Sequence, residues 1–424
     1  MVPVESERRS GQEVLVIGGG IAGITAALEA AEAGCSVILI EKEPYLGGRV
    51  AKTHLYFPKL CPPGCGLEIN FRRIKINPRI QVFTQTELER LEGIPGSYLA
   101  TLRFSPRHVT SDCTLCGACA EACPAERPDT FNEGLSKTRA AYLPFSTAFP
   151  ARYAIDRSAC KDGCRACEEA CKYHAVELAQ QETRKTILVS SVVLATGWAP
   201  YDAARIENLG FGKYPNVLTN VLVERLAAVN GPSGGKLLRP SDGSVPRRVA
   251  FIQCAGSRDQ NHLPYCSSVC CTASLKQCTY FRQLLPDTHI TVFYIDIRTP
   301  GRLEEFLTKV TAAGSIQLVK GKVARIEEDA LTRDLIVHAE DILHGKRLAL
   351  RFDLVVLATG IVPQTSGLPS AFTLDEFGFA TGGSDGLYAA GCVKRPEDVS
   401  ASVRDAASAA LKSLQSAVGS VQHG

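Results

Sequence analysis

The sequence predicts an α/β protein of two doubly wound, parallel-sheet domains, the first of which is interrupted by a small cysteine-rich module. Two strand–turn–helix–strand patterns predict the two sheets, one over residues 13–41 and one over residues 248–295. Between them, residues 105–180 hold eight of the 17 cysteines in two compact blocks. A length of 424 residues is enough for two or three domains.

The elements of the first pattern follow one another without a gap. Glu13–Ile17 and Ser36–Ile40 are short apolar runs typical of buried strands. Ile21–Ala33 carries Ala and Leu at helical spacing, and Gly34 ends it. We expect further strands at Ile187–Ala195, Arg248–Gln253 and Ile290–Ile295, a helix at Ser274–Leu285, an antiparallel meander over 322–357 and an Ala/Ser-rich helix within 387–418.

These elements divide the chain into five segments. The first domain returns twice, because strand-like runs follow both the cysteine-rich insertion and the second domain. The predicted segments are the first part of domain one (1–104), the inserted module (105–180), the return of domain one with a linker (181–246), the second domain (247–350) and the C-terminal part of domain one (351–424).

Composition excludes several classes of protein. With 47 Lys and Arg against 44 Asp and Glu, the chain lacks the basic excess of a nucleic-acid-binding protein. It has no uncharged apolar run of 18 residues, so no membrane span is expected, and residues 1–11 lack the apolar core of a secretory signal. The cysteines are clustered and their total is odd, which in so long a chain favours metal ligation or redox chemistry in the reducing cytoplasm.

The turn after the first strand satisfies the G-x-G-x-x-G pattern. Its first glycine permits the tight turn, its second lets the backbone approach a pyrophosphate, and its third lets the helix pack on the strand. Glu41 ends the next strand, where it can accept hydrogen bonds from a ribose. We therefore expect a bound dinucleotide in this Rossmann-like unit; the turn comprises Gly18, Gly19, Gly20, Ile21, Ala22 and Gly23.

Other short motifs indicate which dinucleotide binds. Lys42 follows the acid, and Gly48-Arg49 resembles the segment that approaches FAD in the flavoprotein disulfide reductase superfamily. Two Ala-Thr-Gly tripeptides and a C-terminal Tyr-Ala-Ala-Gly strengthen that resemblance, although Cys392 stands where the superfamily usually has a flavin-binding Asp. The candidate FAD residues added by these motifs are Ala195, Thr196, Gly197, Thr359, Gly360 and Gly391.

The second dinucleotide-like unit lacks the glycine fingerprint. Its first strand runs into Gln253-Cys254-Ala255-Gly256-Ser257, which does not place the first glycine at the required spacing. A nicotinamide site is therefore not expected there.

The insertion carries two cysteine runs of the bacterial ferredoxin type. The first has the spacing C-x2-C-x2-C-x3-C-P, in which the fourth cysteine binds the other cluster. The second has one extra residue in its first gap and Lys172 in place of Pro. We expect two [4Fe–4S] clusters with crossed ligation: Cys113, Cys116, Cys119 and Cys171 for one, and Cys160, Cys164, Cys167 and Cys123 for the other.

Three smaller features leave alternatives open. Cys254, Cys266, Cys270 and Cys271, with Cys278 nearby, are either ligands of a third cluster or buried structural thiols. Cys61 and Cys65 are either a redox dithiol near the flavin or packing residues. His262 lies within the third set, where a surface role is the simpler interpretation.

A longer resemblance then emerges. A flavin fold with a ferredoxin insertion, followed by Cys254-Ala-Gly-Ser-Arg258 and Tyr265-Cys-Ser-Ser-Val-Cys-Cys271, resembles the A subunits of heterodisulfide reductases. In that family the equivalent cysteines bind a cubane near the flavin. The resemblance therefore implies a third [4Fe–4S] cluster at Cys254, Cys266, Cys270 and Cys271.

Within these relatives, three stretches are similar to A subunits of quinone-interacting membrane-bound oxidoreductase complexes: residues 56–70, 195–202 and 294–301. The resemblance implies electron transfer between menaquinone and adenylylsulfate (APS) reductase in dissimilatory sulfur metabolism. It also implies two partners, a similar B subunit plus a membrane C subunit that binds haem and quinone, which would give a cytoplasmic protein held at the membrane. Homodimer formation is left open.

Three alternatives stand beside this interpretation. One is a heterodisulfide reductase A-like subunit of another sulfur-oxidation or electron-bifurcating complex. The second is an NAD(P)H-dependent flavin reductase that uses Cys61 and Cys65. The third is a structural assembly subunit whose cysteines bind zinc.

Overall fold

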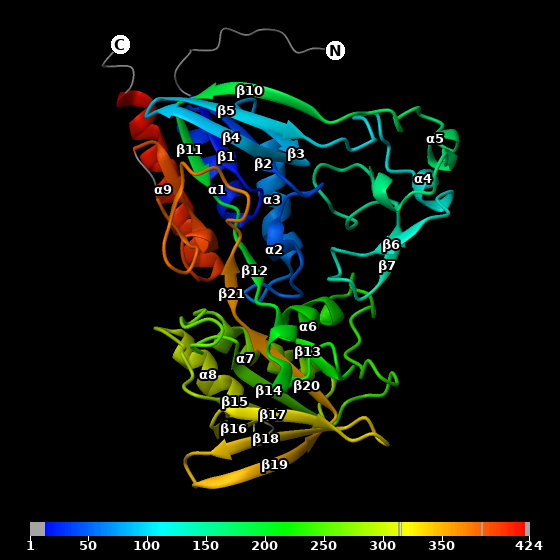
Figure 1. Ribbon diagram of the computed structural model, residues 1–424, viewed down its shortest axis with the longest axis vertical. Coiled ribbons are helices and arrows are strands. Elements are labelled where there is room, and N and C mark those ends of the chain that lie inside the picture. The colour runs from blue at the N-terminus through cyan, green and yellow to red at the C-terminus, as the bar shows by residue number, and fades with distance from the viewer. Residues whose placement is uncertain (1–12, 313, 315, 383–384, 420–424) are drawn as a thin grey trace.

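The computed structural model describes residues 13–419 apart from 313, 315, 383 and 384, so the polar segment 1–11 lies outside the described residues. The chain forms two sheet domains stacked along the long axis, with the cysteine-rich module at the side of the first (Figure 1). Both predicted sheets are present. The α/β fold class with an inserted module is therefore confirmed.

The first domain is built on a parallel five-stranded sheet in the order β24–β11–β1–β2–β3. Helices α1 and α9 pack together on one face of this sheet (Figure 1). The antiparallel sheet β10–β5–β4 packs against the other face. The elements are β1 (Glu13–Ile17), α1 (Ile21–Glu32), β2 (Ser36–Glu41), α2 (Gly48–Ala51), α3 (Pro63–Ile76), β3 (Ile80–Thr84), β4 (Thr86–Ile94), β5 (Ser97–Phe104), β10 (Thr183–Val189), β11 (Ser191–Leu194), β22 (Thr373–Leu374), β23 (Ala380–Gly382), β24 (Leu387–Ala389) and α9 (Val399–Gly419).

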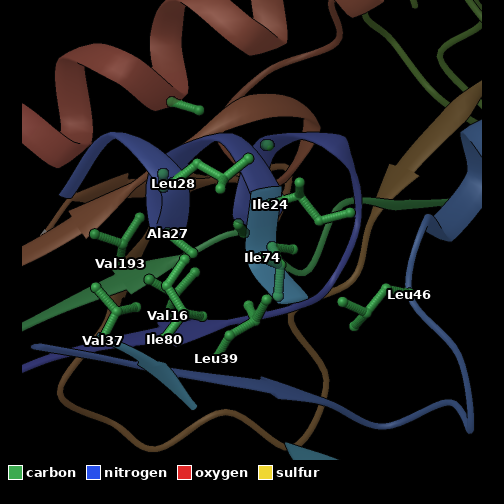
Figure 2. Packing of buried hydrophobic residues seen from close by; sticks show 14 of the residues in the cluster. Val16, Ile24, Ala27, Leu28, Val37, Leu39, Leu46, Ile74, Ile80 and Val193 are labelled. Carbon is green, nitrogen blue, oxygen red and sulfur yellow. The ribbon is translucent and has the colours of Figure 1, made fainter. Parts of the chain in front are cut away.

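Small side chains let the two helices approach closely. In α1 the alanines at 26, 27, 30 and 31 are buried, and they share one core with Ala406, Ala409 and Ala410 of α9. Figure 2 shows Ile24 and Leu28 of α1 above Val16, Val37, Leu39 and Val193 of the sheet. This apolar core fixes the start of α1, which carries the glycine-rich turn.

The second domain has a parallel sheet in the order β13–β20–β14–β15–β16 and an antiparallel sheet β17–β18–β19. A short antiparallel ribbon of β12 and β21 connects it to the first domain (Figure 1). The elements are β12 (Trp198–Pro200), β13 (Val217–Thr219), α6 (Asn220–Ala227), β14 (Arg248–Ala255), α7 (Cys270–Leu284), β15 (His289–Tyr294), α8 (Leu303–Thr311), β16 (Ile316–Lys320), β17 (Val323–Glu328), β18 (Leu335–Asp341), β19 (Lys346–Phe352), β20 (Leu354–Thr359) and β21 (Ile361–Pro363).

The structure differs from the predicted elements in three places. The single strand expected at Ile187–Ala195 is two strands, because the chain leaves the outer sheet at Ser190 and enters the parallel sheet at Ser191. The meander holds for β17–β19, but β20 pairs in parallel with β14. The helix expected at Ser274–Leu285 begins earlier, at Cys270.

These pairings also move two domain boundaries. β13 lies in the predicted linker 181–246 but pairs with β20, so it belongs to the second sheet. β20 lies in the predicted C-terminal part 351–424 but belongs to the second sheet as well. The boundaries at 246/247 and 350/351 are therefore wrong. The reason is that both strands are short and apolar up to a final threonine, a pattern that does not indicate which sheet they join.

The inserted module contains little regular structure. Its own small core gathers Cys119, Cys123 and Cys167 with apolar side chains, while Phe131 and Ala148 pack instead into the core of the first domain. The elements are α4 (Ala118–Glu121), β6 (Glu126–Pro128), β7 (Lys137–Arg139), β8 (Ala141–Tyr142), β9 (Ala154–Ile155) and α5 (Ala166–Glu169).

Candidate functional site: a dinucleotide cradle and three cysteine groups

The glycine-rich turn has the close contacts that its sequence predicts. Gly18 has φ +104°, and a Cβ there would lie 2.4 Å from the carbonyl oxygen of Ala195. A Cβ on Gly23 would lie 1.7 Å from the Gly18 carbonyl oxygen. Gly20 caps α1 without any side-chain hydrogen bond, so the first N–H groups of the helix remain available to a phosphate. Ile21 and Ala22 form the first turn of that helix.

Glu41 is held for hydrogen bonding at the end of β2. Its carboxylate accepts hydrogen bonds from the N–H of Gly19 at 2.6 Å and from the N–H of Glu43 at 2.8 Å. Burial nevertheless raises the pKa of Glu41 to about 7, because desolvation outweighs the two hydrogen bonds. A ribose that donated hydrogen bonds here would favour the ionised carboxylate.

Most of the other candidate FAD residues lie near the same glycine-rich turn. Gly48 faces Gly20, since a Cβ on Gly48 would lie 2.9 Å from the Cα of Gly20. Thr196 donates to the carbonyl of Gln364 at 2.7 Å, and Lys42 donates to the Gln364 side chain at 3.1 Å. Gly197 follows with φ +72°. Ala195 is buried behind the turn.

The C-terminal motif reaches the start of α1. Gly391 has φ +73°, and its Cβ would lie 2.9 Å from the Cβ of Ala22. Its N–H donates to Asp405 at 3.0 Å, so an acid of α9 holds this loop. Cys392 is bonded locally instead, to the carbonyl of Glu397 at 3.3 Å. Neither Asp405 nor Gln364 belongs to a motif, so sequence reasoning missed both.

The side chain of Arg49, which follows Gly48, reaches Trp198, the residue after Gly197. Its guanidinium lies 5.1 Å from the ring centroid of Trp198, and its Nε donates to the Trp198 carbonyl at 3.4 Å. Its Nη1 also donates to Glu133 of the inserted module at 3.0 Å. Sequence reasoning did not foresee that this module contributes a side chain to the crevice.

Thr359 and Gly360 lie elsewhere. They end β20 in the second domain, where the carbonyl of Thr359 accepts a hydrogen bond from Cys270 at 3.4 Å. A Cβ on Gly360 would lie 2.4 Å from Ser257 Oγ and 2.9 Å from Ser267 Oγ. These two residues therefore adjoin the third cysteine set rather than the glycine-rich turn.

The ferredoxin-type cysteines gather as two groups. One small cavity is lined by Cys113, Cys116, Cys119 and Cys171, which are the first expected ligand set. In the second set, Cys123 and Cys164 act electrostatically on Cys160, and Cys123 and Cys160 act on Cys167. Both groups thus bring together cysteines from both sequence blocks.

Burial disfavours ionisation in both groups. Burial, reinforced by Cys113, raises the pKa of Cys119 to about 12. Burial, reinforced by Cys123 and Cys160, raises the pKa of Cys167 to about 11. A metal must displace the protons of such thiols when it binds.

The third cysteine set converges at one end of the second sheet. Cys254 lies at an irregularity in β14 with φ +56°, and Cys270 and Cys271 open α7. Electrostatic interactions connect Cys254, Cys266, Cys270 and Cys271 with one another, whereas Cys278 lies apart in the apolar core. Burial raises the pKa of Cys254 to about 11.

Two arginines flank this set. Arg258 hydrogen-bonds Cys254, and the Arg298 side chain hydrogen-bonds Cys266. Asp296 pairs with both arginines. Hydrogen bonds and charges of this kind adjust the potential of an iron–sulfur cluster.

The remaining candidates have simpler surroundings. Cys61 and Cys65 precede and open α3, and Cys65 is exposed. Both act electrostatically on Tyr56, which lies just before them in the chain. His262 is bonded to Tyr201 OH at 2.8 Å.

Two negative findings apply to the described residues. No group of three or more His, Cys, Asp or Glu side chains there is close enough to hold a metal ion directly. A cubane separates its ligand sulfurs more widely than a single zinc ion does, because each sulfur binds a different iron. No helix within the same residues is long and apolar enough to cross a membrane.

Two family models match parts of the chain. Residues 13–62 match the FAD dependent oxidoreductase family, and residues 106–126 match the 4Fe-4S binding domain. Thioredoxin reductases share the fold: the enzyme of Lactococcus lactis has a TM-score of 0.54 at 13% identity, and that of T. acidophilum has 0.52 at 15%. Each alignment covers 96% of this chain and 99% of the other. Fold and site together define a two-domain flavoprotein oxidoreductase with a 4Fe–4S insertion.

Curated relatives narrow this class. The chain is 38% identical, over 94% of its length, to the iron-sulfur A subunit numbered 2 of the CoB–CoM heterodisulfide reductase of Methanopyrus kandleri. It is 36% identical, over 97% of its length, to the A subunit of the H2:CoB-CoM heterodisulfide,ferredoxin reductase of Methanothermobacter marburgensis. It spans 63% and 65% of these two relatives, less than two thirds of either. The chain is an oxidoreductase subunit related to heterodisulfide reductase A subunits.

Proposed function

We propose that this chain is an electron-transfer subunit that holds one FAD and three [4Fe–4S] clusters. The observation that carries the proposal is the grouping of cysteines into three sets of four around a two-domain flavin fold. A flavin exchanges one or two electrons, whereas a cubane passes one at a time. The protein supplies the positions of these cofactors and tunes their potentials.

The residues described above fit the FAD. The N-terminus of α1 would face the pyrophosphate, Glu41 would accept from the ribose, and the segments at Gly48 and Gly197 would lie beside the bound FAD. In the described part of the second domain no glycine-rich turn follows β14, whose register becomes irregular around Cys254 before the strand ends at Ala255. Its cysteine set occupies the place of a nicotinamide fingerprint, so reduction by NAD(P)H alone is not expected.

The finer assignment is to a complex that links the menaquinone pool to APS reductase. The three stretches at 56–70, 195–202 and 294–301 support it. Its partners would be a similar B subunit plus a membrane C subunit that binds haem and quinone, which would hold a cytoplasmic chain at the membrane. The curated relatives favour a second candidate, an A-type subunit of another heterodisulfide reductase-like complex.

Cofactor counts test the first proposal. Anaerobically purified protein should contain about one FAD and ~12 Fe per chain, with equal acid-labile sulfide. A count of about 8 Fe per chain would contradict the third cluster, and a protein that contains zinc but no flavin would overturn the proposal altogether. For the finer assignment, native purification should recover a membrane partner that contains haem, and the complex should reduce APS reductase with a menaquinol analogue. Co-purification with heterodisulfide reductase-type catalytic subunits would favour the second candidate.

A further inference from the structure

The tip of the β6–β7 hairpin enters the junction between the two sheet domains. We call residues 129–136, which connect these strands, the junction loop. Asp129 organises it by accepting hydrogen bonds from the N–H groups of Phe131 and Asn132 and from Ser136 Oγ. Its shape is therefore fixed from within, and its outward side chains are free to contact both domains.

Consecutive residues of this loop contact different domains. Phe131 packs in the core of the first domain, 5.6 Å from the ring of Tyr45. Asn132 accepts two hydrogen bonds from Arg225 of α6, at 3.0 and 2.8 Å. Glu133 accepts from Arg49 at 3.0 Å and from Lys52 at 2.8 Å, both on the same carboxylate oxygen.

The backbone conformation of Glu133 is one that favours glycine. Its φ is +54°, in the left-handed region that favours glycine, and the next residue, Gly134, also has positive φ. A glutamate at such a position is held there by its surroundings rather than by its own preference. Its carboxylate is well shielded, with 18% of the side chain exposed, so the two ion pairs are less screened than surface pairs are.

Arg49 is held from two sides. Trp198 fixes one side of its guanidinium, through the ring and the main-chain carbonyl, and Glu133 fixes the other. Arg49 directly follows Gly48, which faces the glycine-rich turn. The guanidinium therefore lies between the segment at Gly48 and the segment that follows Gly197.

We infer that Glu133 is a positioning residue that lowers the flavin's potential by partly neutralising the positive charge of Arg49 and Lys52. This inference rests on the proposed binding of FAD. The reduced flavin carries more negative charge than the oxidised flavin, so nearby positive charge favours reduction. Removing the Glu133 carboxylate leaves Arg49 and Lys52 uncompensated, while Trp198 still holds Arg49 in place.

The test is a redox titration of the flavin in the purified holoprotein, followed by its visible absorbance. In Glu133→Gln the midpoint potential should rise above that of the wild type. Glu133→Gly should give the same positive shift, because glycine suits the backbone at this position while the carboxylate is lost. The matched control is Glu126→Gln, which removes an equal charge from the base of the same hairpin; among the described residues Glu126 pairs with Lys137 and Arg139 only.

The possible results separate the two proposals. Wild-type protein without flavin contradicts the proposed function. If the Glu133 variants bind flavin and keep the wild-type midpoint potential, the proposed role of Glu133 is wrong. It is also wrong if Glu126→Gln shifts the potential as much as Glu133→Gln does, or if Glu133→Gly does not shift it. Iron content and the flavin-to-protein ratio of every variant show whether the module is still folded and docked.

Discussion

Removing the carboxylate of Glu224 should destabilise the junction between the domains more than any surface change. Glu224 lies on α6 and forms an ion pair with Lys276 of α7 at 2.9 Å, with only 7% and 5% of the two side chains exposed. It also accepts hydrogen bonds from Gln277 at 2.7 Å, from Tyr280 at 3.1 Å and from the N–H of His54 at 3.0 Å. Glu224→Ala therefore leaves one buried cation without its counter-charge and removes one acceptor from each of three neutral donors.

The magnitude follows from these partners. Breaking a buried ion pair by deleting one member costs about 3–5 kcal/mol, because the remaining charge stays desolvated. The neutral donors add little to this cost, because Gln277 and Tyr280 also donate to the carbonyls of Asn220 and Leu55. We expect Glu224→Ala to lower the free energy of unfolding of the junction by roughly 4 kcal/mol. The double variant Glu224→Leu/Lys276→Met should lose less, because neither charge is left unpaired.

Urea unfolding of the holoprotein can measure this loss through the fluorescence of Trp198, the sole tryptophan of the chain and a residue of the interdomain ribbon. Glu89→Ala is the control, since it removes an exposed partner of Arg184 and should leave the unfolding free energy almost unchanged. A loss below about 1 kcal/mol in Glu224→Ala would refute the reasoning. A double variant as unstable as the sum of its two single variants would refute it as well.

Three further predictions concern the cofactor sites. Gly23→Ala should abolish FAD binding, because the new Cβ would lie 1.7 Å from the Gly18 carbonyl oxygen, whereas Gly64→Ala should leave FAD binding intact. The ratio of flavin absorbance to protein absorbance in the purified variants measures the bound FAD. The affinity of the flavin-free chain for FAD should rise as pH increases toward 7 and then level off. The reason is that the ribose favours the ionised form of Glu41, whose pKa is about 7. Titration calorimetry should find no such pH dependence in Glu41→Gln. The same raised pKa means that Glu41 adds stability to the flavin-free chain below the unfolded pKa, near 4.5, and that this stability is lost as pH rises through 7. Cys266→Ser should reduce iron from ~12 to ~8 per chain while flavin is retained, and Cys278→Ala, in the apolar core, should leave iron unchanged.

Local sequence determined the parts of the structure that depend on local contacts. The span Glu13–Ile17, the turn that follows it and the helix from Ile21 agree with the structure because apolar period, glycine and helix end all indicate the same unit. The grouping of the cysteines into three sets followed from spacing and resemblance. Short apolar strands such as β13 and β20 were assigned to the wrong segment, because only pairing distinguishes one buried sheet from another.

Residues that act across domains left no signal in the sequence. Glu133, Gln364 and Asp405 each reach the crevice from a distant segment, and an isolated Glu, Gln or Asp matches no motif. Glu133 carried one weak hint, since Asn132-Glu133-Gly134 has the composition of a turn. Its ion pairs depend on how the module docks, which only long-range packing decides.

The strand order of the first sheet has a consequence for how the protein is made. Its central strand β1 pairs with β11, almost 180 residues later in the chain, and its edge strand β24 and helix α9 come later still. A ribosome therefore releases the whole cysteine module, residues 105–180, long before the first sheet can be completed. Cluster insertion can begin on the nascent chain, whereas a closed flavin crevice must wait for the last helix. The order of synthesis thus favours iron loading before flavin loading.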